Sequence, residues 1–98
     1  MERDKVKELD EYSNELGVSQ LLLRVIIAYA IVYIKNYDVY TPKEMVYNLA
    51  KESLDRVDIE YVKSIGKNEN RMRVYGREIV QEVANDMGIV NTKKNNLL

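Results

Sequence analysis

Apolar residues recur at helical spacing from the start of the chain. Val6, Leu9 and Leu16 stand between charged residues, and Gly17 follows where a left-handed residue would end a helix. The pattern predicts an exposed amphipathic helix over residues 3–16.

The longest apolar run covers residues 21–34 and is interrupted only by Arg24. It is rich in β-branched residues, but a run of this length is more typical of a buried helix than of a strand. Because Ser19 suits an N-cap, we expect the helix over residues 19–36. Its apolar surface exceeds the needs of one small core, which predicts self-association through this helix and its acidic neighbour. We expect its tyrosine stripe to pack rather than to stack on bases: Tyr29, Tyr33, Tyr37 and Tyr40.

The strongest helix start is Thr41-Pro42-Lys43-Glu44. Thr41 suits the N-cap, a proline in the first helical position loses no hydrogen bond, and Glu44 completes a capping box. We therefore expect a helix from this point to about Arg56.

Two winged arrangements fit the remaining pattern, and a plain helical bundle is the third alternative. In the first, Asp58 caps a short turn or helix over residues 59–65, and an amphipathic helix over residues 70–87 ends before Gly88. A short strand over residues 89–93 follows it.

In the second arrangement, residues 59–65 and 71–75 are two strands of a β-hairpin wing that turns at Lys67-Asn68. The helix that starts at Thr41 then becomes the recognition helix. Residues 77–87 form a closing or dimerisation helix.

The amino-acid composition excludes several kinds of catalytic and metal-binding site. The 98 residues form one small domain and include no His and no Cys, which excludes imidazole bases, thiol nucleophiles, disulfides and zinc fingers. Glu78, Glu82 and Asp86 follow one another at helical spacing, but such a row is more typical of a solvated helix edge than of a catalytic pair. We therefore expect no enzyme, no cofactor and no metal site.

The formal net charge is only −1, but the charge is unevenly distributed. Five cations between positions 63 and 77 face the single acid Glu69: Lys63, Lys67, Arg71, Arg73 and Arg77. The acidic N-terminus differs from a signal peptide, and residues 21–34 are too few to span a bilayer. These features predict a cytoplasmic protein with an anionic partner.

Residues 70–93 resemble part of a winged helix-turn-helix domain. The resemblance lies in the start of the helix, its end and the residues after it: Asn70-Arg71-Met72-Arg73-Val74, Met87-Gly88-Ile89-Val90 and Asn91-Thr92-Lys93. It is similar to the winged-helix module of archaeal origin-recognition initiators and to small partition proteins of archaeal plasmids such as AspA. The second arrangement resembles PadR-like regulators. The resemblance implies a mainly α winged helix-turn-helix with a minimal β-wing and an extra N-terminal amphipathic helix. The single domain 1–98 would then dimerise through residues 3–36 and bind DNA through residues 41–93.

Double-stranded DNA is the implied partner. Arg71 and Arg77 suit guanine edges, Gln81 suits adenine, and Arg73 suits a phosphate. Further phosphate contacts are expected from the helix start, the polar connector and the truncated wing: Thr41, Lys43, Lys63, Lys67, Asn68, Asn70, Lys93 and Lys94.

The sequence thus predicts a homodimer that binds specific DNA sites, either to regulate transcription or to mark a plasmid partition site. The alternative is a helical adaptor or structural protein that does not bind DNA and whose basic segment is merely solvated. A net charge of −1 leaves that alternative open, because strong non-specific DNA binders usually carry net positive charge.

Overall fold

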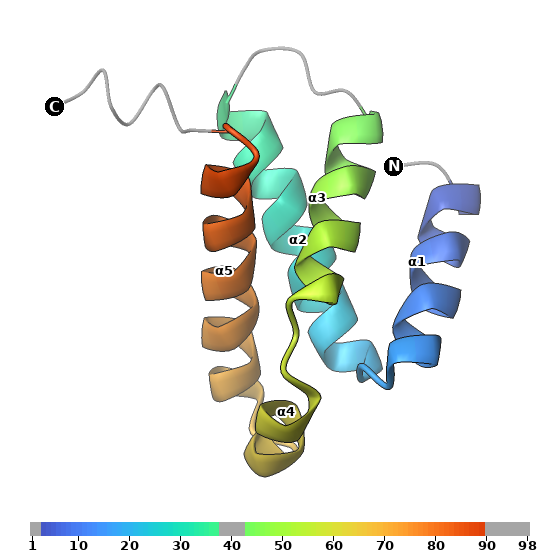
Figure 1. Ribbon diagram of the computed structural model, residues 1–98, viewed down its shortest axis with the longest axis vertical. Coiled ribbons are helices and arrows are strands. Elements are labelled where there is room, and N and C mark those ends of the chain that lie inside the picture. The colour runs from blue at the N-terminus through green and yellow to red at the C-terminus, as the bar shows by residue number, and fades with distance from the viewer. Residues whose placement is uncertain (1–2, 38–42, 90–98) are drawn as a thin grey trace, which may run out of the picture.

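A computed structural model describes residues 3–37 and 43–89 of the chain. All regular structure in this part is helical: the long helices run alternately down and up, and one short helix lies at the lower end of the molecule (Figure 1). They are α1 (Arg3–Leu16), α2 (Gln20–Tyr37), α3 (Lys43–Asp55), α4 (Ile59–Ile65) and α5 (Glu69–Asp86).

The core is built around α2, which packs against α5 on one side and α3 on the other, while α1 covers the α2–α3 side. Each helix contributes the apolar face that its spacing predicts. Fully buried side chains come from α1, α2, α3 and α5: Leu9, Leu22, Ile26, Ile34, Leu49, Leu54, Val80 and Val83.

Most helix ends follow the sequence signals. Gly17 and Gly88 have φ values of +82° and +79°, as expected for left-handed residues that end α1 and α5. Ser19 Oγ accepts a hydrogen bond from the backbone N–H of Leu22 at 3.3 Å, so it caps α2. The Asp58 carboxylate accepts from the N–H groups of Glu60 and Tyr61 and caps α4. The expected helices over residues 3–16, 19–36 and 70–87 are therefore confirmed to within one residue at each end.

The winged fold is wrong. No strand occurs in residues 3–37 or 43–89, although mainly α is correct. Residues 59–65 and 71–75 lie in α4 and α5, which removes the hairpin wing. Residues 71–75 are helical for two reasons. Asn68 caps the start of α5, and Met72, Gly76 and Ile79 repeat at helical spacing on its buried side.

The other expected wing strand, over residues 89–93, falls almost wholly outside the described residues. Ile89 is buried in the core and donates its N–H to the carbonyl of Ala84 at 2.8 Å. It therefore completes the end of α5 rather than starting a ladder with another strand. The expected N-cap at Thr41 also lies outside the described residues, and α3 is described from Lys43.

Candidate nucleic-acid interface

The basic segment of the sequence folds into a corner between two helices. Gly66, Lys67 and Asn68 connect α4 to α5, and Gly66 has a φ of +67°, which a residue with a Cβ adopts only with strain. Figure 1 shows α4 at the lower end of α5. The short, glycine-containing turn between α4 and α5 is of the kind that also joins the two helices of helix-turn-helix motifs.

Contacts between the two helices fix this corner. The Tyr75 hydroxyl on α5 accepts a hydrogen bond from the backbone N–H of Asp58 at 2.8 Å. The rings of Tyr61 and Tyr75 lie 4.7 Å apart between centroids and are tilted by 58°. Because Asp58 also caps α4, one residue fixes the start of α4 and attaches it to α5.

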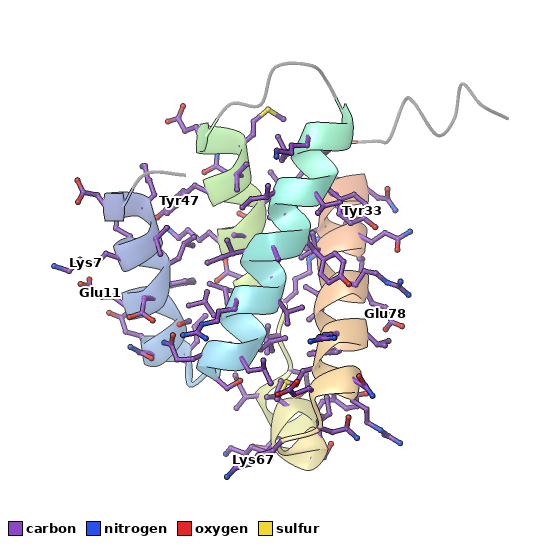
Figure 2. All side chains as sticks on the ribbon, turned by 180° about the vertical axis from the view of Figure 1, so that it is seen from behind. Lys7, Glu11, Tyr33, Tyr47, Lys67 and Glu78 are labelled. Carbon is purple, nitrogen blue, oxygen red and sulfur yellow. The ribbon has the colours of Figure 1, made fainter. Side chains whose placement is uncertain are left out.

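All five basic side chains of the segment are exposed. Lys67 lies at the tip of the corner (Figure 2). Two of the other four make loose ion pairs, Lys63 with Glu60 at 3.7 Å and Arg73 with Glu69 at 4.0 Å. Exposed pairs of this kind contribute little to stability, so these cations remain accessible to an anionic partner.

The exposed surface of α5 has a centre and two flanks. Asn70, Val74, Arg77 and Gln81 follow one another at i, i+4, i+7 and i+11, which places them along one line; we name these four residues the outer stripe of α5. Arg71 and Arg73 lie on opposite sides of this stripe, because residues two apart on a helix point about 200° apart.

This geometry divides the predicted base-contacting residues between the outer stripe of α5 and a flank. The sequence prediction placed Arg71 beside Arg77 and Gln81 as base contacts, but six positions along a helix separate two side chains by about 120°. Arg71 therefore belongs to a flank. Asn70, predicted only to follow the DNA backbone, takes its place in the stripe.

Arg77 lies close to α2. Burial raises the pKa of Tyr33 on α2, and the nearby positive charge of Arg77 opposes that shift. Figure 2 shows Tyr33 between α2 and α5. Tyr29 and Tyr33 are half-buried, which agrees with their expected packing role, whereas the side chains of Tyr37 and Tyr40 lie outside the described residues.

Sequence reasoning missed an apolar part of the corner. Tyr61 and Val74 are 42% and 48% exposed, which is high for large apolar side chains. They line a shallow hollow of about 210 Å³ together with Asn70 and Arg71. The available signal was that Val62 is the buried residue of the short capped helix, so that Tyr61 beside it faces outward.

Acidic residues follow the basic residues along α5 and mark the end of the basic region. Arg56, just after α3, pairs with Glu82 at 3.0 Å and with Asp86 at 2.5 Å, and these bonds raise its pKa. Glu78 is exposed as well. The carboxylate row is a solvated edge tied to Arg56, and no three carboxylates gather into a metal-binding cluster in the described ranges.

Two other predicted contact residues, Asn68 and Lys43, differ from the exposed cations of the corner in role or in position. The side-chain oxygen of Asn68 accepts from the N–H of Arg71 at 3.1 Å, so this side chain caps α5. Lys43 starts α3 at the end of the molecule opposite the α4–α5 corner (Figure 1), and one short stretch of DNA at the corner would not reach it. Thr41, Lys93 and Lys94 lie outside the described residues.

Comparisons with protein-family models, with curated proteins and with solved structures gave no match to this chain. Within residues 3–37 and 43–89, no helix combines the length and the hydropathy needed to cross a membrane. The functional argument therefore rests on the geometry of the α4–α5 corner and of α2.

Proposed function

We propose that this protein binds specific sites on double-stranded DNA through the α4–α5 corner, with the first turns of α5 in the major groove. It has no enzymatic role and acts in the cytoplasm on transcription or on the partition of a plasmid. The major groove is about 12 Å wide and admits one α-helix. In a helix-turn-helix, the first residues of the second helix contact base edges.

One observation carries the proposal: the outer stripe of α5 has an arginine on each flank. A helix in the major groove has base edges in front of it and a phosphate backbone on either side. Asn70 and Gln81 suit adenine, Arg77 suits guanine, and Val74 suits a thymine methyl group. Arg71 and Arg73 then reach the phosphate backbones on the two sides of the major groove. Lys63 and Lys67 add phosphate contacts at the turn between α4 and α5.

The acids on α5 define how far the helix enters the groove. Glu78 and Glu82 begin in the third turn, so Gln81 between them is the last residue of α5 that reaches the DNA. Since phosphates repel this acidic end, the helix has to tilt out of the groove there. The footprint of one copy is accordingly short, only a few base pairs.

The experiment is a selection of binding sites from random duplexes, followed by fluorescence anisotropy with the enriched and a scrambled duplex between about 50 and 300 mM salt. We expect tighter binding to the enriched duplex, with affinity falling steeply as salt rises. Arg77→Ala should remove this preference, while Lys51→Gln on α3 is the matched control and should retain it. No enrichment, or no binding at the lowest salt, would contradict the proposal.

A further inference from the structure

The solvent side of α2 is an apolar face with a cation at each end. Arg24, Ala28, Ile31 and Lys35 follow one another at i, i+4, i+7 and i+11, with Ile27 and Val32 beside them. We name these six residues the outer face of α2. Figure 2 shows α2 in front of the other helices, with α1 and α5 on either side and no described helix over it.

The apolar residues of this face are accessible. Val32 is 47% exposed and Ala28 is exposed, while Ile27 and Ile31 are half-buried. The small side chain of Ala28 in the middle permits close approach of another helix. Exposed apolar residues that gather on one face indicate a binding surface, whereas isolated ones do not.

A groove extends the outer face of α2 toward α1. It has a volume of about 410 Å³ and includes apolar side chains from both helices, Leu23 and Ile27 of α2 and Val6 of α1, which is 40% exposed. Its polar residues are Lys7, Asp10, Gln20 and Arg24. Asp10 accepts a hydrogen bond from the side-chain amide of Gln20 and keeps its negative charge, so the two cations Lys7 and Arg24 give the groove a small positive excess.

Charge disfavours a second copy of α2 as the occupant. The 18 residues of α2 contain Arg24 and Lys35 and no acid. If two copies of α2 packed in parallel, Arg24 would meet Arg24, and if they packed antiparallel, Arg24 would meet Lys35. Either arrangement brings like charges together without an acid on α2 to separate them.

Charge also disfavours an extended polyanion. The exposed side of α1 carries four acids at i, i+4, i+7 and i+11, and the last three line a hollow with Tyr47 and Lys51 of α3: Asp4, Glu8, Glu11 and Glu15. A DNA duplex or an anionic membrane is wide enough to meet these acids as well as the outer face of α2. A single helix is about 10 Å wide and avoids them.

We propose that the outer face of α2 and the α1–α2 groove bind an amphipathic helix of another protein, whose apolar residues are flanked by Asp and Glu. The apolar residues of the partner cover Ile27, Ala28 and Val32. Its carboxylates pair with Arg24 and Lys35, which are about 16 Å apart along α2 at 1.5 Å per residue, and with Lys7 at the groove. This inference is independent of DNA binding at the α4–α5 corner.

The test is a displayed library of amphipathic helical peptides with Glu, Gln or Lys at the positions that flank the apolar residues, selected against the full chain. We expect peptides with Glu to be enriched. The affinity of the best peptide, measured by fluorescence anisotropy, should fall at least about tenfold in Arg24→Glu/Lys35→Glu and in Val32→Asp. Lys51→Glu on α3 is the matched charge control and should bind like the original chain. Circular dichroism checks that each variant is folded.

Five results would overturn the inference. They are enrichment of Lys peptides, no enrichment at all, and unchanged affinity in Arg24→Glu/Lys35→Glu. The fourth is a chain that sediments as a dimer which Val32→Asp dissociates, because a second copy then occupies the face. Binding to phosphatidylserine vesicles that depends on Arg24 and Lys35 would likewise replace the helical partner with a membrane.

Discussion

Gly76 on α5 lies directly against Val25 on α2. A Cβ atom at position 76 would be 2.5 Å from Cγ1 and 3.3 Å from Cβ of Val25, well inside van der Waals contact. Gly76 is therefore a point of close approach between the two longest helices. A glycine in the middle of a helix costs about 1 kcal/mol relative to alanine, and this close packing compensates for that cost.

Gly76→Ala should destabilise the fold even though alanine favours helix. The steric cost of an added methyl group in a well-packed core is about 1 to 3 kcal/mol, and it exceeds the gain in helix propensity. Urea unfolding followed by circular dichroism measures the difference in the free energy of unfolding. In Val25→Ala/Gly76→Ala the added methyl finds space, so the double variant should lose less stability than the two single variants combined. Purely additive losses would mean that the two residues do not touch.

Helix ends and buried faces were predictable because their signals are local. Gly17 and Gly88 end helices, Asp58 and Ser19 start them, and the buried side of α5 follows from the spacing of its apolar residues. Each signal acts within one or two turns of the chain. Neighbouring residues therefore contain all the information that these features need.

The orientation of α2 and the choice of helix over strand at residues 71–75 were not predictable in this way. Because α2 is apolar on nearly all sides, its spacing does not show which side faces solvent; its contacts with α3 and α5 decide that. Met72 and Val74 alternate with charged residues as in a strand. The cap at Asn68 and the contact of Gly76 with Val25 select helix instead, and the latter depends on a distant part of the chain.

Stability should fall in alkaline solution, and Tyr12 should contribute to the fall. Its hydroxyl donates to the carboxylate of Asp55, which joins α1 to the end of α3. This hydrogen bond is the main cause that raises the pKa of Tyr12, and burial and the charge of Asp55 add to it. A folded pKa above the unfolded value gives a stabilisation that is complete below about pH 10 and is lost as pH rises through the folded pKa.

Urea unfolding between about pH 8 and pH 11 measures this loss. We expect Tyr12→Phe and Asp55→Asn to lose stability less steeply with pH than the original chain, since neither retains the phenol–carboxylate bond. The pKa values of Tyr33 and Tyr47 are also raised, mainly by burial, so part of the decline should remain in both variants. Identical slopes in all three proteins would show that Tyr12 titrates normally.

Two substitutions of Asn68 distinguish its role as a helix cap from an effect on DNA binding. Because its side chain caps α5, Asn68→Ala should cost about 1 kcal/mol of stability, whereas Asn68→Asp retains a good cap. The aspartate adds a negative charge beside Lys67, and it should therefore weaken DNA binding while stability is preserved. Thermal unfolding and anisotropy on the same samples test this. If Asn68→Asp bound DNA as tightly as the original chain, DNA would have to bind elsewhere on the molecule.

Arg77 and Lys67 should affect DNA binding in different ways. Arg77 lies in the outer stripe of α5, so Arg77→Ala should cost about 1 to 3 kcal/mol on the preferred duplex and much less on a scrambled one. Lys67 is at the tip of the corner and suits a phosphate. Lys67→Gln should weaken binding to the preferred and the scrambled duplex equally. It should also reduce the steepness of log K against log salt by about 0.9. Equal losses on both duplexes for Arg77→Ala would instead place Arg77 on the phosphate backbone, and base recognition would then have to come from Asn70 and Gln81.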